Sequence, residues 1–274
     1  MQVGPFTTLV PLQYLKGHSS RLTTAAANTE LLRGQFPQFR MNMAQTQNAD
    51  LFSSIGEQYE AAFGHDQGLL KFTQKVLEHL KPNSHILDVG CGTGKPVATT
   101  AAEAGHKITG IDLSEVMVEL ASKAVPTGTF EVADMLTYQP KDIKFDAVFN
   151  MLSLFLLRRQ DVELMATRWN CWLPLGGILA IGTGAAEDVH PEKLEVQYDE
   201  DGACARKMPF EFMGKPITID MFTRAGWEKL LVDAGFEVLY TTTDVFVPPP
   251  ETGCQTEPHY FIMAKKIRER GDSE

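Results

Sequence analysis

The sequence is short of basic residues and has no long apolar run. Its 274 residues include 35 acidic and 25 basic side chains, which gives a net charge of −10. No basic stripe is present to neutralise a phosphate backbone, so we expect no nucleic-acid partner. No apolar stretch approaches the ~18 residues that cross a bilayer, so we expect no membrane span.

Cysteine is scarce and scattered. The four cysteines form no C-x-x-C pair, which argues against a zinc site or a disulfide framework and predicts reduced thiols and a cytoplasmic location. No metal is expected. The first 40 residues contain a single acid, Glu30, so a mitochondrial presequence is an alternative to an N-terminal lid or tail.

The chain changes character near residue 49. Residues 1–48 show no clean period and are predicted to be an N-terminal extension, either a lid, a tail or an arm of a homodimer. Residues 49–274 are predicted to form one domain. It opens with amphipathic helices over 49–63 and 68–81, where apolar residues recur at helical spacing.

Short β-rich runs then alternate with helical segments. The expected strands cover 85–89, 107–113, 128–135, 145–151, 176–183, 236–247 and 259–266, and the expected helices cover 94–105, 114–125, 158–173 and 223–236. This alternation predicts an α/β fold with βαβ units and a doubly wound, mostly parallel sheet.

Residues 184–222 fit that alternation poorly because they are dense in charge. We interpret them as an insertion that covers the carboxyl edge of the sheet, where open α/β sheets bind their ligands. The run from Tyr198 to Lys207, "YDEDGACARK", is predicted to be a solvated loop.

The stretch "HILDVGCGTGKP" places Gly90, Gly92 and Gly94 directly after a strand and before a helix. Such glycines let the chain turn sharply and let a ligand approach the backbone without meeting a Cβ atom. Asp112 follows Gly90 by 22 residues, at the end of the next strand, where a carboxylate can accept both hydroxyls of a ribose. The pattern predicts a cofactor that contains adenosine.

The spacing separates two kinds of cofactor. A dinucleotide site needs G-x-G-x-x-G, but Lys95 stands where its third glycine belongs. Asp88 precedes the glycines and can hold an ammonium group, so a cofactor with an amino-acid tail and no phosphate fits better. A nicotinamide-dependent oxidoreductase is further disfavoured because the sequence has no Tyr-x-x-x-Lys pair.

Four motifs in order resemble those of class I S-adenosylmethionine-dependent methyltransferases. They are "ILDVGCGTG", "GIDLSEVMVELA", "VADM" and "FDAVFNM", and the resemblance extends from about residue 52 to residue 265. It is nearest to the small-molecule group that includes the ubiquinone-biosynthesis type and many natural-product methyltransferases. The resemblance implies a Rossmann-like seven-stranded sheet with an antiparallel last strand, and S-adenosylmethionine as cofactor.

The resemblance also implies which residues bind that cofactor. The glycine loop passes under the methionine part, and the Asn150 backbone meets its amino-acid end. Asp134 and Met135 hold the edge and the face of the adenine. The implied cofactor-binding residues are Tyr59, Asp88, Gly90, Cys91, Gly92, Gly94, Asp112, Leu113, Met117, Asp134, Met135 and Asn150.

Three of these residues also have an ordinary structural explanation. Asp112, implied to bind the ribose, can simply cap the following helix. Asp134 can be a turn acid, and Tyr59, implied to close over the cofactor, can be a core aromatic residue. Taken together with the glycines, Asp112 favours the cofactor site.

The acceptor and the chemistry at it are less defined. Relatives often carry a histidine shortly after the fourth strand, but this chain has Leu154 and Phe155 there. With Met151 and Met213 these residues predict an apolar pocket and a small, apolar or aromatic acceptor. No catalytic base is assigned; His65 and His190 are the candidates.

Two alternatives stay open at this point. The chain can bind the cofactor without transferring its methyl group, as a regulatory partner or as an enzyme that uses the sulfonium charge on a rearranging substrate. The methylated atom, whether oxygen, nitrogen, carbon or sulfur, is not fixed by the sequence.

Overall fold

The computed structural model describes residues 50, 52–140, 144–188, 196–213, 215–252 and 254–269. The chain divides into two units, residues 1–43 and 44–274, and the description below concerns the second. The predicted N-terminal extension and the candidate base His190 lie outside the described residues. No helix in the described ranges is both long and apolar enough to cross a membrane.

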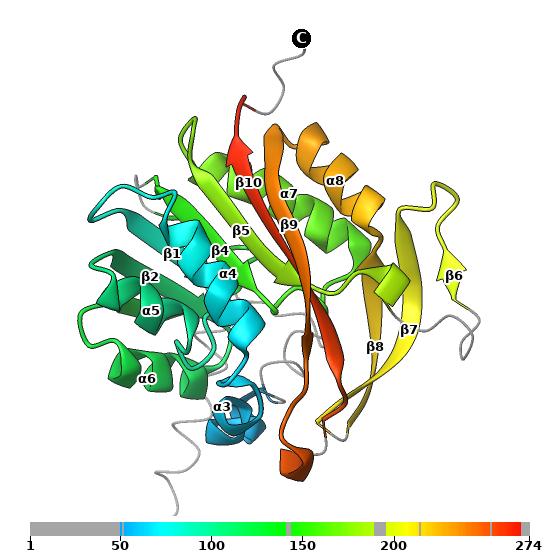
Figure 1. Ribbon diagram of the computed structural model, residues 1–274, viewed down its shortest axis with the longest axis horizontal. Coiled ribbons are helices and arrows are strands. Elements are labelled where there is room, and N and C mark those ends of the chain that lie inside the picture. Colours follow the sequence, from blue (N-terminus) through cyan, green and yellow to red (C-terminus); the bar gives the residue numbers. More distant parts are fainter. Residues whose placement is uncertain are drawn as a thin grey trace, which may run out of the picture. The chain divides into compact units, whose positions relative to one another are not determined.

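A seven-stranded sheet forms the centre of the second unit, with the strand order β3-β2-β1-β4-β5-β10-β9 (Figure 1). Its strands are β1 (His85–Val89), β2 (Lys107–Asp112), β3 (Thr129–Val132), β4 (Ala147–Met151), β5 (Ile178–Thr183), β9 (Phe236–Phe246) and β10 (Glu257–Lys266). β1 to β5 run parallel, and β10 is antiparallel to both β5 and β9. The predicted Rossmann-like sheet with an antiparallel last strand is confirmed.

Helices cover both faces of this sheet (Figure 1). They are α4 (Gln67–Leu77), α5 (Val97–Glu103), α6 (Glu115–Ala124), α7 (Arg159–Trp172) and α8 (Arg224–Asp233). α7 and α8 pack on one face with Trp169 and Phe236, while α4 and α5 pack on the other with Phe72 and Phe261. Because both faces are covered, β4 and β5 are buried throughout. Central parallel strands of this kind have nearly continuous apolar sequences.

Side-chain caps set where several helices begin. Ser114 Oγ accepts a hydrogen bond from Met117 N at the start of α6, which confirms the predicted cap. Thr223 Oγ1 accepts from Gly226 N at 2.9 Å, and Asp66 Oδ1 accepts from Leu69 N at 2.9 Å. These caps place α6, α8 and α4 directly after the turns that precede them.

The first predicted helix, over 49–63, is not continuous. Residues 52–55 are helical, but Gly56 has a φ of +47° and α3 (Glu57–Phe63) starts after it. A left-handed residue interrupts the helical hydrogen bonding, and glycine adopts it at little cost. Gly64 ends α3 as predicted.

The charged insertion contains a second, three-stranded antiparallel sheet. It consists of β6 (Gln197–Tyr198), β7 (Cys204–Phe212) and β8 (Lys215–Phe222). The prediction of a solvated loop is wrong from Cys204 onward, because Cys204 and Ala205 are fully buried. Two acids of this run pair with Arg159: its Nη1 lies 2.7 Å from Asp199 Oδ2, and its Nη2 lies 2.5 Å from Asp201 Oδ2.

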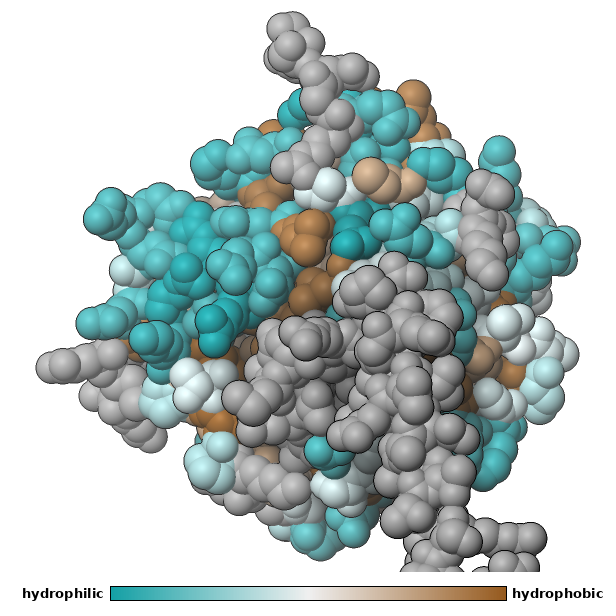
Figure 2. Space-filling view, turned by 180° about the vertical axis from the view of Figure 1, so that it is seen from behind, coloured by the Kyte–Doolittle hydropathy of each residue, from teal (hydrophilic) through white to brown (hydrophobic). Residues whose placement is uncertain are grey.

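Hydrophilic residues dominate the coloured surface on the side opposite to that of Figure 1, and hydrophobic ones are confined to small patches (Figure 2). This distribution agrees with the acidic composition, since most of the charge is exposed. The single short helical turns η2 (Ala186–Asp188) and η4 (Pro250–Thr252) complete the described elements.

Candidate functional site

The glycine loop lies between β1 and α5. Gly90, Gly92 and Gly94 have φ values of +69°, +51° and +77°. At Gly90 an added Cβ atom would lie 2.5 Å from the Cβ of Ser153, closer than real side chains pack. Gly90 N donates to Ile111 O at 2.8 Å. The loop therefore needs glycine and is tied to the end of β2.

Asp112 connects the glycine loop to the start of α6. Its Oδ2 accepts from Gly92 N at 3.0 Å, and its Oδ1 accepts from Ser114 N at 2.9 Å. Burial raises the pKa of this carboxyl, and the backbone N–H donors of Ser114 and Gly92 oppose that rise. The hydrogen bond from Ser114 N shows that Asp112 does help to order the start of α6, the alternative role considered for it. Each carboxylate oxygen still retains a lone pair that can accept a hydrogen bond from a ligand hydroxyl.

Asp88 is a buried acid next to the loop, with 2% of its surface exposed. Burial and the nearby charge of Asp112 raise its pKa to about 7. Its Oδ2 has no hydrogen-bond partner among the described residues, and a buried unsatisfied acceptor is costly. A positively charged group placed here would satisfy the oxygen and restore the ionised form, so an ammonium group fits the site.

The turn after β4 packs against the glycine loop, with Ser153 next to Gly90. Asn150 is fully buried, and its Nδ2 donates to Val89 O at 2.9 Å and to Ser153 Oγ at 2.5 Å. Leu152 adopts a φ of +53°, while its N–H donates to Gly182 O at 2.7 Å. These bonds hold Ser153 directly against Gly90.

One cavity collects most of the residues that the sequence singled out. It lies at the carboxyl edge of the sheet, where the ends of β1, β2, β3 and β4 meet α3. Its lining comprises Phe52, Tyr59, Gly90, Gly92, Ile111, Asp112, Leu113, Met117, Ala133, Asp134, Met135, Met151, Leu152, Ser153, Leu156 and Leu157. We call this space the cofactor cavity.

Four residues of the implied set do not line the cofactor cavity. They are Asp88, Cys91, Gly94 and Asn150, all of them buried. Asp134 does line it and also accepts from Leu136 N at 2.9 Å, so its role as a turn acid is present as well. Cofactor contacts for the whole set stay a prediction.

Sequence reasoning missed part of this lining. Ser153 is not among the residues that the sequence singles out, because its position against Gly90 exists only in the folded chain. Leu154 was expected in the pocket, but it is 2% exposed and packs with Trp169 of α7. Met151 does line the cavity as expected.

An aromatic cluster borders the cofactor cavity and joins three separate segments. Phe212 of β7 lies 5.8 Å from Phe52, 5.8 Å from Phe63 and 5.5 Å from Phe155, measured between ring centroids. Tyr59 lies 5.0 Å from Phe63. Burial raises the pKa of Tyr59, and the charge of Glu257 adds to this, so the phenol is neutral.

None of the histidines in the described part of the chain lines this cavity. His65 is exposed and lines a neighbouring cavity on the other side of α3. His259 is buried between Asp66 and Glu257, with its Nδ1 2.7 Å from Asp66 Oδ2. Among the residues the structure describes, no cluster of three or more histidine, cysteine or acidic side chains is arranged to hold a metal ion.

Residues 86–177 match the family model described as a methyltransferase domain. Over 92 residues the chain is 38% identical to an O-methyltransferase from Pyrenophora dematioidea, a match that covers 31% of this chain and 34% of that protein. It is 33% identical to phosphoethanolamine N-methyltransferase 1 from Arabidopsis thaliana over 45% of this chain and 26% of that protein. The chain thus spans about a quarter to a third of these curated relatives.

A longer match is to methyltransferase GfsG from Streptomyces halstedii, with 29% identity over 73% of this chain and 70% of that protein. Among solved structures, magnesium protoporphyrin IX methyltransferase from Synechocystis with bound S-adenosylmethionine has a TM-score of 0.59 at 18% identity, covering 83% of this chain and 99% of that one. The [4+2]-cyclase SpnF has a TM-score of 0.58 at 20% identity, covering 82% and 97%. These two likenesses are of fold.

Proposed function

Because residues 86–177 belong to the methyltransferase-domain family and the sheet has the fold of S-adenosylmethionine-dependent methyltransferases, we propose that the chain transfers a methyl group from S-adenosylmethionine to a small acceptor. The acceptor is apolar or aromatic, and the transfer is an in-line displacement. The observation that carries the proposal is the cofactor cavity, in which the glycine loop faces Asp112 and Met135.

The residues present suit this cofactor. Asp88, with its unpartnered buried oxygen, suits the α-ammonium group, and Asp112 suits the ribose hydroxyls. Asp134 and Met135 suit the adenine. When bound, S-adenosylmethionine supplies a methyl group attached to a positively charged sulfur, and the neutral thioether that remains is a good leaving group.

The chain's own contribution to the reaction is alignment and exclusion of water. The turn after β4 and the aromatic cluster border the same cavity, so an acceptor held between them is fixed relative to the glycine loop. Such positioning can contribute ~7–11 kcal/mol toward the barrier. The cavity walls present apolar groups such as Met151 and Leu156, which favours an apolar or aromatic guest.

The acid-base requirement depends on the acceptor. Tyr59 and Ser153 are the hydroxyls on the described wall of the cavity, and Tyr59 stays protonated because burial raises its pKa. A neutral amine can attack without a base, and a phenol or thiol near its pKa needs little help. Free cysteines (Cys91, Cys171, Cys204 and Cys254) suit a reducing compartment such as the cytoplasm.

The test is a turnover screen with the full chain. S-adenosylmethionine is incubated with phenols, thiols, amines and polyketide-like acids, and mass spectrometry detects acceptors that gain one methyl group. We expect a methylated product whose yield falls in Asp112→Ala and is unchanged in Glu119→Gln, a substitution at an exposed acid of α6. Failure of the chain to bind S-adenosylhomocysteine in calorimetry would contradict the proposal.

A second candidate is cofactor binding without methyl transfer. The likeness to a [4+2]-cyclase supports it only at the level of fold, since the same architecture hosts that different chemistry. Calorimetric binding of S-adenosylhomocysteine, together with no methylated product across the screen, would favour this candidate over the first.

A further inference from the structure

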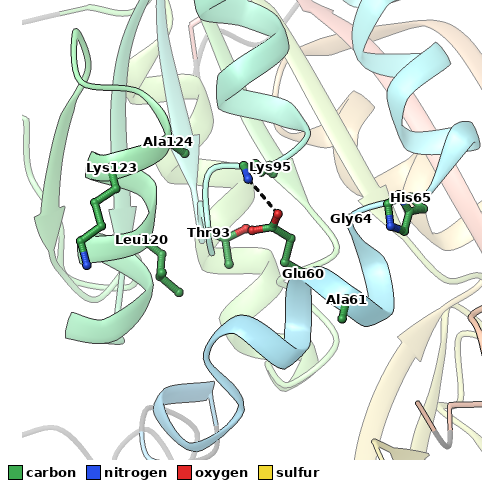
Figure 3. Close-up of a pocket in the computed structure, with 9 residues that line it drawn as sticks. All are labelled: Glu60, Ala61, Gly64, His65, Thr93, Lys95, Leu120, Lys123 and Ala124. Carbon is green, nitrogen blue, oxygen red and sulfur yellow. Dashed lines mark hydrogen bonds and ion pairs between the residues drawn. The ribbon is translucent and has the colours of Figure 1, made fainter. Parts of the chain in front are cut away.

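A second cavity of about 560 Å³ lies beside the cofactor cavity, on the other side of the glycine loop. Its walls are α3, the end of the glycine loop and α6 (Figure 3). This volume lies within the ~300–1,000 Å³ of small-molecule sites. We call it the lysine cavity after the two lysines that line it, Lys95 and Lys123.

The lysine cavity has a positive side in an acidic protein. Lys95 comes from the loop, and Lys123 comes from α6, where it makes no ion pair within the described part of the chain. Lys95 Nζ lies 2.8 Å from Glu60 Oε1, with the two side chains 44% and 39% exposed. An ion pair this exposed contributes ~0–1 kcal/mol, so another anion can replace Glu60 at small cost.

Thr93 adds a polar group that lacks a partner. The residue is 2% exposed, and its Oγ1 has no hydrogen-bond partner among the described residues. Figure 3 shows Thr93 and Lys95 on the same loop, with Glu60 of α3 reaching toward that loop and paired with Lys95. Thr93 and Lys95 both line the lysine cavity, and a hydroxyl and an ammonium group are donors that suit an oxyanion.

We propose that the lysine cavity binds a small molecule carrying a carboxylate or phosphate group, held by Lys95, Lys123 and the Thr93 hydroxyl. The Glu60 carboxylate occupies the place of that anionic group, and the ligand displaces it. The site is separate from the cofactor cavity and stands on its own geometry, whether or not the chain transfers methyl groups.

The two cavities share their walls. Glu60 follows Tyr59 in α3, and Tyr59 lines the cofactor cavity; Thr93 follows Gly92, which also lines it. A ligand that displaces Glu60 therefore acts on the same helix and loop that border the cofactor. Any effect it has on cofactor affinity must be reciprocal, because the coupling is a single free energy.

The test is calorimetric titration of the full chain with citrate and with inorganic phosphate at constant ionic strength. Glu60→Gln removes the internal competitor, so we expect its dissociation constant for the anion to fall about fivefold. Lys95→Met and Lys123→Met are expected to raise that constant about fivefold or more, and Thr93→Val to raise it less. Lys229→Met, at an exposed lysine of α8, serves as the matched control and should change nothing.

Several results would overturn the proposal. One is the absence of binding of either anion by both the wild type and Glu60→Gln, with folding verified by circular dichroism. Another is equal weakening in Lys229→Met and Lys95→Met, which would mean general charge attraction. Complete displacement of citrate by S-adenosylhomocysteine, one molecule for one, would show a single shared site and would also overturn it.

Discussion

Asp112 uses both of its carboxylate oxygens inside the protein. One oxygen fixes Gly92 and the other fixes Ser114, so the residue shapes the glycine loop and the start of α6 at once. Asp112 is therefore both a proposed ligand-binding residue and a residue that fixes the backbone around the site. Its replacement should therefore affect binding and local order together.

Asp112→Ala is expected to raise the dissociation constant for S-adenosylhomocysteine about 30-fold, because hydrogen bonds to a charged acceptor contribute ~2 kcal/mol. Calorimetry measures the change. Asp112→Asn keeps one acceptor oxygen and should fall between wild type and Asp112→Ala. Unchanged affinity in both variants would contradict the assignment of Asp112 to the cofactor site.

Asp88 makes the protein sensitive to pH without any ligand. Its pKa is raised by burial and by Asp112, from 3.8 to about 7, so the native state holds this proton more tightly than the unfolded chain. The corresponding stabilisation is complete below pH ~4 and is lost as the pH rises through 7. Cofactor binding has the opposite dependence, because an ammonium group needs the ionised acid.

Asp88→Asn is expected to remove this part of the pH dependence. The free energy of unfolding of the ligand-free variant should be higher than that of wild type by ~1–3 kcal/mol at pH 8, and its affinity for S-adenosylhomocysteine should be lower. Denaturant unfolding from pH 4.5 to 8 provides the measurement. Parallel curves for the two proteins would mean that Asp88 titrates normally.

At the scale of elements, the sequence predicted the central sheet well. "HILDV" is β1 residue for residue, because a short, mainly apolar run between a Pro-Asn turn and a glycine loop has few other ways to be buried. The positions of the glycine loop and Asp112 were predicted in the same way, from the short strands that they follow. Their proximity follows from adjacent parallel strands, which end at one edge of the sheet.

The elements that the sequence did not predict depend on distant partners. The strand β7 follows a charged stretch; it pairs with β8 and buries Met208 and Phe212, while Arg159 on α7 pairs with Asp199 and Asp201 in the turn before it. His259 looked like an ordinary residue at a strand start. Its acidic partner Glu257 is two residues away in the sequence, but its other partner, Asp66, is 193 residues away. Folding alone brings Asp66 next to His259, so the sequence could not indicate this pair.

His259 clamps the corner between α3 and α4 to β10. Burial opposes its charge, but the hydrogen bonds and charges of Asp66 and Glu257 outweigh burial and raise its pKa to about 9. The clamp therefore contributes fully below pH ~6.5, the value in an unfolded chain, and is lost as the pH rises through 9. The corner directly follows α3, the helix that contains Tyr59 of the cofactor cavity.

Asp66→Asn is expected to lower the free energy of unfolding by a few kcal/mol at pH 7 and to flatten its fall between pH 6.5 and 9. Asparagine still caps α4, so the change isolates the ion pair. Denaturant unfolding across this pH range is the measurement, with the exposed histidine variant His79→Gln as control. A slope equal to that of wild type would exclude the clamp.

For the whole molecule, the question is how the small sheet is held to the large one. Phe212 of β7 meets Phe52, Phe63 and Phe155, which come from the helical segment before the sheet and from the turn after β4. Arg159 of α7 adds ion pairs with Asp199 and Asp201 on the polar side. The aromatic contacts are buried, whereas the ion pairs are partly exposed, so we expect the first to dominate.

Phe212→Ala is therefore expected to lower the free energy of unfolding by about 3–5 kcal/mol, since Phe212 is 3% exposed. Leu175→Ala, at a side chain that is 61% exposed, should change it by less than ~0.5 kcal/mol. Denaturant unfolding of both variants provides the comparison. Similar losses in the two would mean that the small sheet is held by other contacts.

The outer position of β9 has a consequence for the protein in solution. Within the described residues this eleven-residue strand has β10 as its one strand neighbour, and Val245 near its end is 60% exposed. An unpaired strand edge can template association between copies, and mutual repulsion at a net charge of −10 opposes it. That repulsion vanishes near the isoelectric point of about 5.2. Light scattering should therefore rise sharply around pH 5 and fall again at pH 8, which makes colloidal stability, rather than folding, the limit on handling this protein in mild acid.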